Sequence, residues 1–260
     1  MLIHDALAGK HALVCGASQG IGRACALELA RAGARLTLLA RQEEALAAVR
    51  QDLEGPNRGH TQRACDMGDL AQVRQLLATL PSDVDILICN SGGPAPGPVL
   101  DAAPEAFVTA MTQHLLAPQL LVQALVPHMK ASGYGRIINI ISTSVKIPLP
   151  GLGVSNTIRG AVASWSKTLA HEVGPFGITV NNVLPGYTRT QRLDQIIHNT
   201  AVKRDKTRDT ITEDFLREIP AARFAEPQET AYACVFLASP FASYVNGINL
   251  PVDGGRTGRL

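Results

Sequence analysis

The sequence predicts an α/β fold: a doubly wound parallel sheet of seven strands with helices on both faces. Short runs rich in Leu, Ile and Val recur along the chain, and longer amphipathic segments separate them. Strands of a parallel sheet are apolar throughout because helices cover both of their faces. Alternating strand and helix units imply right-handed crossovers, which place the strands side by side in one sheet.

The expected strands are runs of branched aliphatic residues without polar alternation. They lie at residues 11–15, 34–40, 84–89, 136–142 and 178–184. The segment INLPVDGG, at 248–255, closes the chain as the seventh strand with its turn. Neither face of these strands is therefore expected to meet solvent.

The expected helices fill the intervals between the strands. They cover residues 21–33, 43–55, 69–80, 104–130, 153–173 and 227–238. Gly33 and Gly55 each follow an amphipathic run and are expected to end a helix, because glycine tolerates the left-handed conformation found there. Pro81 is expected to stop the third helix.

The whole chain, residues 1–260, is expected to form one domain. It contains no internal repeat and no low-complexity linker. The segment 186–225 is the irregular part, because it is polar and charged and lies between the sixth strand and the last helix. We expect it to hold short helices rather than core.

The composition excludes several classes of function. The chain has 260 residues, 46% of them hydrophobic, and its net charge is +2. Such a chain can bury a core, and it has no basic field that would attract nucleic acid or an anionic membrane. No apolar run reaches the ~18–20 residues that span a bilayer. The first residues lack the layout of a signal peptide, so a cytoplasmic location is expected.

The cysteines predict reduced thiols and no metal site. The chain has five, Cys15, Cys25, Cys65, Cys89 and Cys234, and none forms a CxxC pair. An odd number of cysteines within apolar runs is typical of small buried hydrophobic residues. No His or Cys stands at ligand spacing from another, so no zinc site is expected.

A glycine-rich loop follows the first expected strand and opens the first expected helix. It reads Gly16-Ala-Ser-Gln-Gly20-Ile-Gly22. Glycines allow a tight turn and a close approach of the backbone to a pyrophosphate, and the helix N-terminus attracts negative charge. The loop therefore predicts a dinucleotide site. The alternative is a loop that glycine tightens for packing alone.

Several further motifs, in order, resemble the short-chain dehydrogenase/reductase family, of the 3-oxoacyl-acyl-carrier-protein reductase type. They are CGASQGIG (15–22), CDM (65–67), CNSGG (89–93), GRIINIIS (135–142), the run 165–186 and PVDGG (251–255). The resemblance covers nearly the whole chain. It implies a single-domain Rossmann fold with a third strand before Cys65, and an oxidoreductase that uses a nicotinamide cofactor.

The end of the second strand indicates which cofactor is used. In the family, an acidic residue there binds the ribose 2′-hydroxyl and selects NAD. This chain has Arg41 followed by Gln42 instead. An arginine pairs with a 2′-phosphate, so NADP(H) is expected rather than NAD(H), with Ser18, Gln19 and Arg41 around that phosphate. The alternative for Arg41 is a solvated cation at a helix start.

The resemblance also assigns the rest of the cofactor site, residue by residue. It places Asp66 and Met67 beside the adenine, and Asn90 and Gly92 beside the adjacent ribose. It implies that Pro185, Gly186, Thr188 and Thr190 hold the nicotinamide carboxamide and the phosphates. The loop residues Gly16, Ser18, Gln19, Gly20, Ile21 and Gly22 complete the set, with Arg159 at the nicotinamide ribose.

The catalytic positions depart from the family pattern. The family uses a Ser, a Tyr with a Lys four residues later, and an Asn on the preceding long helix. Ser142 occupies the Ser position, and Ser155 follows it by thirteen residues where the Tyr is expected. Arg159 then stands at the Lys position and His114 at the Asn position.

These changes alter the chemistry. A serine is a poorer proton donor than a phenol of pKa about 10. Loss of a placed general acid costs roughly 10²–10⁴-fold in rate. Arg159 keeps the positive charge but does not release a proton near neutral pH. His114, Lys146 and Tyr187 are the candidates to supply the proton instead; the alternative is that they are structural, lining or solvated residues.

Three functions stay open from sequence. The first is an NADP(H)-dependent oxidoreductase acting on a carbonyl or secondary alcohol, with 3-oxoacyl thioesters as one candidate. The second is a non-catalytic NADP(H)-binding protein that acts as a sensor or a partner subunit. The third is a lyase or dehydratase using Ser142, His114 and Lys146 without hydride transfer.

Two expectations concern partners. The basic residues between 189 and 208 either meet an acidic carrier or acid substrate or are merely solvated: Arg189, Arg192, Lys203, Arg204, Lys206 and Arg208. The resemblance implies a homotetramer assembled through the two long helices and the C-terminal strand. The apolar segments 115–126 and 160–165 agree with this, because neither is suited to water on all sides.

Overall fold

The computed structural model describes residues 5–258, apart from the side chain at position 56. Its centre is one sheet of seven parallel strands in the order β3-β2-β1-β4-β5-β6-β7. The strands are β1 (His11–Cys15), β2 (Arg35–Ala40), β3 (Thr61–Ala64), β4 (Ile86–Cys89), β5 (Gly135–Ile140), β6 (Ile178–Pro185) and β7 (Asn249–Val252). The expected fold class is confirmed.

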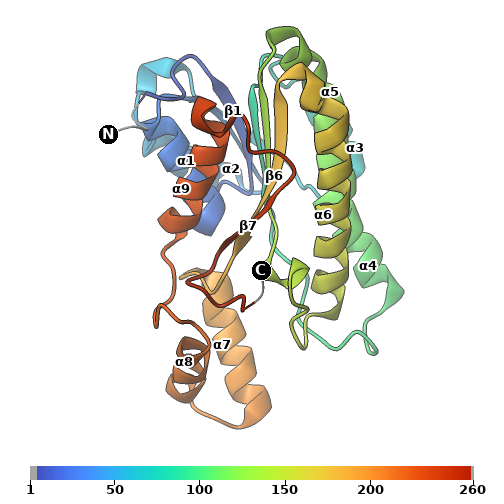
Figure 1. The fold of residues 1–260 in the computed structure, drawn as a ribbon, viewed down its shortest axis with the longest axis vertical. Helices are drawn as coiled ribbons and strands as arrows, with labels where there is room; N and C mark the ends of the chain where they lie inside the picture. The colour runs from blue at the N-terminus through green and yellow to red at the C-terminus, as the bar shows by residue number, and fades with distance from the viewer. Residues whose placement is uncertain (1–4, 259–260) are drawn as a thin grey trace.

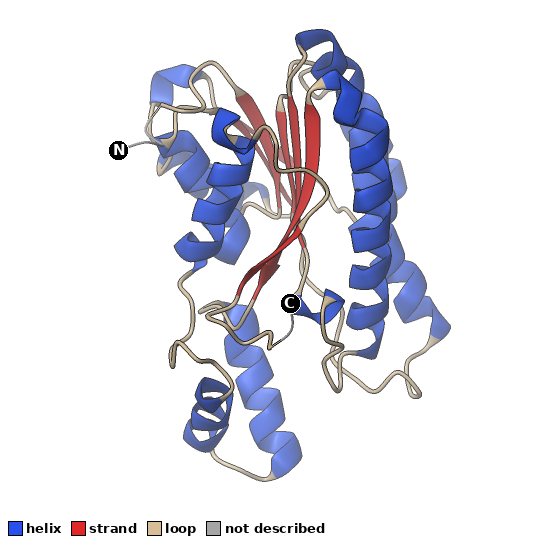
Figure 2. Cartoon of the chain, viewed as in Figure 1, coloured by secondary structure: helices blue, strands red, loops and turns tan. Residues whose placement is uncertain are grey.

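Helices cover both faces of the sheet (Figures 1 and 2). One layer contains α1 (Gly20–Arg31), α2 (Glu43–Gln51) and α9 (Pro227–Ala238), and the other contains α3 (Leu70–Leu77), α5 (Ala117–Ser132) and α6 (Gly153–Val173). The side chains between the sheet and each layer form two apolar clusters, in which Leu36 and Ile88 face one layer and Leu87 and Ile137 face the other. Strands buried on both faces explain why their sequences lack polar alternation.

Local sequence explains most helix ends. Asp69 caps α3 by accepting hydrogen bonds from the backbone N–H groups of Ala71 and Gln72, at 2.8 and 3.2 Å. Gly33 has a φ of 101°, as expected for the residue that follows a helix end. Gly55 was expected to end α2, but α2 ends at Gln51 and Gly55 instead opens a short 3₁₀ turn over Pro56–Arg58.

The long helix expected over 104–130 is interrupted by a wider turn. It consists of α4 (Pro104–Met111), a π-helical segment (Thr112–Leu116) and α5. Such π turns are frequent at functional sites because they re-aim one side chain. Here the segment carries His114, which is buried.

The segment 186–225 contradicts one expectation. It forms two helices, α7 (Gln191–Arg204) and α8 (Arg208–Arg217), which stand apart from the main layers (Figure 1). They enclose an apolar cluster of their own: Leu193, Ile197, Ala201, Ile211, Phe215, Ile219 and Phe224. The expectation of helices without core was wrong, because the apolar residues are sparse in sequence and converge only when α7 and α8 pack together.

Three further features concern the sequence expectations. Among residues 5–258, no helix is both long and apolar enough to cross a membrane. The same residues contain no group of three or more His, Cys, Asp or Glu side chains that could hold a metal ion. The five cysteines are buried free thiols, and burial raises the pKa of Cys89 to about 12.

Candidate active site

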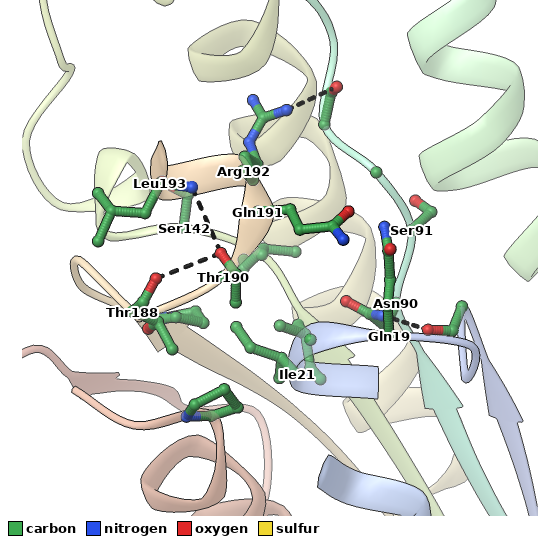
Figure 3. Close-up of a pocket in the computed structure, with 18 of the residues that line it drawn as sticks. Gln19, Ile21, Asn90, Ser91, Ser142, Thr188, Thr190, Gln191, Arg192 and Leu193 are labelled. Carbon is green, nitrogen blue, oxygen red and sulfur yellow. Dashed lines mark hydrogen bonds between the residues drawn. The ribbon is translucent and has the colours of Figure 1, made fainter. Parts of the chain in front are cut away.

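A cleft of about 950 Å³ lies at the carboxyl ends of the strands. Its walls come from the β1–α1 loop, the ends of β2 to β5, the start of α6 and the segment that follows β6 (Figure 3). The chain order reverses between β1 and β4, and open α/β sheets bind ligands in the crevice at that point. A volume of this size suits a dinucleotide with a small substrate.

The β1–α1 loop is shaped to bring the backbone close to a ligand. Gly16 has a φ of 62°, which disfavours any residue with a side chain. A Cβ on Gly22 would lie 2.1 Å from the carbonyl oxygen of Gly16, so only glycine fits there. Asn90, after β4, donates a hydrogen bond of 3.3 Å to the same carbonyl and ties the loop to the sheet (Figure 3).

The start of α1 adds free donors to this loop. No side chain caps the helix at Gln19, and its first turn contains no acidic residue. The first backbone N–H groups therefore have no intrahelical acceptor, which makes this end attractive to an anion. The loop and the helix start fit the pyrophosphate of a dinucleotide.

Arg41 lies on the cleft wall beyond β2 with its charge unpaired. It is exposed, and among residues 5–258 no carboxylate forms an ion pair with it. Arg23, which lines the same cleft, is by contrast paired with Asp52 at 2.8 Å. Ser18 and Gln19 line the same cleft. These three residues fit a phosphate on the adenosine ribose, because the Arg41 guanidinium breaks no ion pair when it binds that phosphate.

Asp66 and Met67 line the cleft after β3, as expected. The Asp66 carboxylate accepts a hydrogen bond of 2.8 Å from the N–H of Gly68 through one oxygen. The backbone N–H of Asp66 donates to the Gln72 side chain at 3.1 Å. These bonds hold the Asp66 carboxylate at the cleft wall.

Ser142, Ser155 and Arg159 all line the cleft, after β5 and at the start of α6. The Ser142 hydroxyl oxygen accepts a hydrogen bond of 3.1 Å from the N–H of Ser144, so its proton stays available to a ligand. Ser155 and Arg159 lie one turn apart on α6 and are both 7% exposed. Arg159 donates to the carbonyl oxygen of Ile140 at 3.0 Å.

His114 lies behind the cleft rather than on its wall. Its Nδ1 is 2.7 Å from the hydroxyl oxygen of Ser91, which does line the cleft, and its Nε2 is buried without a partner. Burial, with help from the charges of Arg159 and Arg192, lowers the pKa of His114 to about 2. The imidazole is therefore neutral at pH 7. It also borders a cavity of about 10 Å³, close to the space of one water.

Comparison with known proteins agrees with this geometry. The family model described as Enoyl-(Acyl carrier protein) reductase matches residues 16–257. The gluconate 5-dehydrogenase of Gluconobacter oxydans is 32% identical over 254 residues, 96% of each chain. The 3-oxoacyl-acyl-carrier-protein reductase FabG of Rickettsia bellii is 32% identical and covers 96% of this chain and 97% of its own.

Solved structures match equally well. The L-sorbose reductase of Gluconobacter frateurii, complexed with NADPH and L-sorbose, superposes with a TM-score of 0.90 at 31% identity and full coverage of both chains. The NADPH-dependent reductase YwfH of bacilysin biosynthesis gives a TM-score of 0.90 at 30% identity, covering 96% of this chain and 99% of its own. This chain belongs to the short-chain dehydrogenase/reductase family. The family and the oxidoreductase class expected from sequence are thereby confirmed.

Two of the candidate proton donors of this short-chain dehydrogenase/reductase lie outside the cleft or are held in other hydrogen bonds. Lys146 is exposed and is not among the residues that line the cleft. Tyr187 lines the cleft, but its ring stacks on Phe215 at 4.5 Å. Its hydroxyl donates to Glu218 at 3.4 Å and accepts from Arg256 at 3.1 Å, and burial raises its pKa to about 12.

The segment after β6 places the remaining expected residues. Pro185, Gly186, Thr188 and Thr190 all line the cleft. Thr190 caps α7, donating to the Thr188 carbonyl at 3.2 Å and accepting from the N–H of Leu193 at 3.4 Å (Figure 3). The cap directs the start of α7 toward the cleft.

The structure adds residues to the cleft that the sequence did not indicate, and it gives Arg192 a place in the cleft wall. Ser91 was not singled out, although it directly follows Asn90 at the end of β4. Leu149 and Leu152 form an apolar wall in the loop before α6. Arg192 was grouped with the charged residues of its segment, but it lines the cleft and donates to the carbonyl oxygens of Gly93 and Pro94 (Figure 3).

Proposed function

We propose that this protein is an NADP(H)-dependent oxidoreductase that interconverts a carbonyl compound and a secondary alcohol with an altered proton-donor set. One observation carries the proposal: a single cleft runs from the unpaired Arg41, over the bare glycine loop, to the hydroxyl groups of Ser142 and Ser155. Relatives that are named as NADPH-dependent reductases support the choice of cofactor.

The cofactor would lie along the carboxyl ends of the strands. Arg41, Ser18 and Gln19 would hold the 2′-phosphate, and the β1–α1 loop with the start of α1 would hold the pyrophosphate. Arg159 would bind the hydroxyls of the nicotinamide ribose. When bound, the reduced cofactor supplies a hydride to the carbonyl carbon, so that the carbonyl is reduced and the cofactor is oxidised.

Ser142 and Arg159 would stabilise the oxygen of the substrate. The Ser142 hydroxyl donates a hydrogen bond to the carbonyl oxygen, where negative charge develops as the carbon is reduced. The buried positive charge of Arg159 lowers the energy of that developing charge, because the surrounding protein screens it weakly. Both groups hold the oxygen without needing to release a proton.

The proton for that oxygen would come from water through side-chain hydroxyls. Ser155 faces the cleft from α6, where the family places its tyrosine, and can pass a proton from water to the oxygen. The pair of His114 and Ser91 offers a second route, because Ser91 lines the cleft and His114 borders the water-sized cavity. We retain both routes as parts of the proposal.

The substrate and assembly belong to the same proposal. The segment 186–225 would form the substrate-binding loop, since it supplies one wall of the cleft. A 3-oxoacyl thioester or a sugar ketone would suit a cleft of this size, and FabG and L-sorbose reductase are relatives named for such substrates. We also propose that the protein is cytoplasmic and assembles as a homotetramer.

One experiment tests the function directly. NADPH binding is measured by fluorescence, and NADPH oxidation is followed against a panel of ketones, 3-oxoacyl thioesters and keto sugars. Turnover of at least one substrate is expected. Binding without turnover on every substrate would indicate a non-catalytic NADP(H)-binding protein, and conversion without NADPH oxidation would indicate a lyase or dehydratase.

A variant tests the cofactor preference. Arg41→Asp should weaken NADPH binding by roughly 10- to 100-fold, because it removes a charge-assisted pair and adds repulsion. Its effect on NADH should be much smaller, since NADH has no 2′-phosphate. Arg50→Asp, on the outer part of α2, serves as the control. Equal losses of affinity for NADPH and NADH in Arg41→Asp would contradict a preference for NADP(H).

A further inference from the structure

Two arginines at the substrate end of the cleft have no acidic partner. Arg159, 7% exposed, donates one hydrogen bond, to the carbonyl oxygen of Ile140. Arg192, from the first turn of α7, donates to the carbonyl oxygens of Gly93 and Pro94 at 3.0 and 3.2 Å. Carbonyl oxygens satisfy donors but do not neutralise charge, so both positive charges remain uncompensated.

The two guanidinium groups also act on each other. The charge of Arg192 and the burial of Arg159 together lower the pKa of Arg159 to about 10. His114, which lies near both, is neutral and adds no negative charge. The one carboxylate among the described residues that line the cleft is Asp66, after β3 at the opposite side of the sheet. Arg159 is buried and Arg192 is half-buried, and positive charges held there without a carboxylate favour an anion as the ligand.

The local structure holds Arg192 in place. A Cβ on Gly93 would lie 2.7 Å from the Nη2 of Arg192, so a glycine is required for the side chain to reach its carbonyl partners. Thr190 caps the helix two residues earlier, which fixes the direction from which Arg192 enters the cleft. Figure 3 shows Arg192 extending from α7 across to the loop after β4.

We propose that the substrate carries a carboxylate and that Arg192 binds it, while Arg159 binds the nicotinamide ribose as proposed above. The inference rests on the proposed function, because it concerns the same cleft. A guanidinium group binds a carboxylate through charge-assisted hydrogen bonds. Arg192 has five N–H donors, and its two carbonyl partners accept from one hydrogen of each Nη, so the remaining donors can reach a carboxylate.

The cofactor phosphates are the other source of an anion in this cleft. They are expected at Arg41 and at the glycine loop, where a Cβ on Gly20 would lie 3.3 Å from the Cγ2 of Thr190 at the start of α7. The experiment therefore measures NADP⁺ affinity beside substrate affinity. If Arg192 binds a carboxylate of the substrate, its substitution lowers the affinity for the substrate. If it binds a phosphate of the cofactor, its substitution lowers the affinity for NADP⁺.

The test compares acids with their methyl esters. Acetoacetate and pyruvate are assayed with NADPH beside methyl acetoacetate and methyl pyruvate. The acids are expected to have the higher kcat/KM. Arg192→Gln should lower the acid-to-ester ratio of kcat/KM about tenfold or more, because the hydrogen bonds to charge are lost. Arg192→Lys should give an intermediate ratio.

A matched control and a binding measurement complete the test. Arg217→Gln alters an exposed arginine of α8, which is paired with Asp214 at 3.0 Å and does not line the cleft, and should leave the acid-to-ester ratio within about twofold. Calorimetry measures acetoacetate binding to the NADP⁺-saturated protein. Arg192→Gln should weaken that binding about tenfold with NADP⁺ affinity little changed.

The outcomes separate this inference from the proposed function. Reduction of esters as efficiently as acids would overturn the inference and leave the oxidoreductase standing. Failure to reduce any carbonyl, with acetoacetate binding that Arg192→Gln weakens, would overturn the function and support the anion site. Absence of acetoacetate binding, or a loss of NADP⁺ affinity as large as that of acetoacetate, would overturn the inference.

Discussion

Ser142 is the residue at which the predicted chemistry and the observed contacts agree most closely. It stands at the end of the strand-like run IINIIS and keeps its hydroxyl proton free, since its oxygen is the acceptor for Ser144. Lys146 is only four residues further along, yet it points to solvent. Proximity in sequence therefore does not decide which side chains share the cleft.

The first prediction concerns these residues. Ser142→Ala should lower kcat by roughly 10²-fold or more, because it removes a donor aimed at a developing negative charge. Lys146→Ala and Tyr187→Phe should change kcat by less than about twofold on the same carbonyl substrate. Steady-state NADPH oxidation measures all three. A loss in Lys146→Ala or Tyr187→Phe as large as that in Ser142→Ala would identify the altered residue as a donor.

His114 couples the site to pH. Burial lowers the pKa of His114 from its ordinary value of 6.5 to about 2 in the folded protein. The unfolded chain therefore binds a proton below about pH 6.5 that the folded protein does not. The stability contributed by neutral His114 is complete above that pH and decreases as the pH falls toward 2.

The second prediction follows from this loss of stability at low pH. Between pH 7.5 and 5, this group should lower the free energy of unfolding by about 2 kcal/mol. His114→Gln should remove that part of the pH dependence, as measured by urea unfolding at the two values. His171→Gln, an exposed histidine on α6, is the control. An unchanged pH dependence in His114→Gln would contradict the assignment of a neutral buried imidazole.

The start of α7 lines the cleft, and α7 packs against α8. Its apolar cluster is separate from the clusters on the two faces of the sheet. Phe215 lies at its centre, 6% exposed and stacked on Tyr187. A unit held by few contacts with the main core can open locally without unfolding the sheet.

The third prediction tests this independence. Phe215→Ala should destabilise the α7–α8 unit by about 3 kcal/mol, because a buried aromatic ring is removed. Hydrogen exchange should accelerate at residues 191–217 and stay unchanged in β1, β4 and β5. Val202→Ala, at a side chain on α7 that is 71% exposed, is the matched control. Equal acceleration in the sheet would show that the unit opens only with global unfolding.

At the scale of the whole molecule, four aromatic side chains are exposed on α9 and in the residues just beyond it. Tyr232 and Phe236 of α9 are 52% and 39% exposed, and Phe241 and Tyr244, just beyond it, are 59% and 102% exposed. By contrast, Leu121, Val122 and Leu125 of the apolar segment 115–126 face the core. Exposed aromatic side chains gathered in one segment are typical of a protein interface.

The fourth prediction concerns assembly. Light scattering should give the mass of four chains. Phe241→Glu should reduce that mass to two chains, because a charge placed in an apolar interface is costly and the second interface remains. Phe176→Glu, at a 42% exposed ring beneath Lys130, is the control. A mass equal to one chain for the unaltered protein would contradict the proposal of a tetramer.

The sequence by itself determined the fold and the family, and it predicted the cofactor half of the site. Buried parallel strands need apolar runs, and a close approach of backbone to phosphate needs glycine, so both leave a signal in consecutive residues. Six of the seven strands and the helices of the two layers follow from such signals. The edge strand β3, with the sequence TQRA, has no such signal, and only the family resemblance located it.

Only the tertiary structure decided which side chains line the cleft where the substrate is proposed to bind. Arg192 reaches the cleft from α7 to meet Gly93, ninety-nine residues earlier, and no local pattern records that contact. The π turn that buries His114 and the network that holds the Tyr187 hydroxyl arise in the same way. Such side chains are positioned by packing between distant segments, so their burial and partners, which set their charge, appear only when the chain is folded.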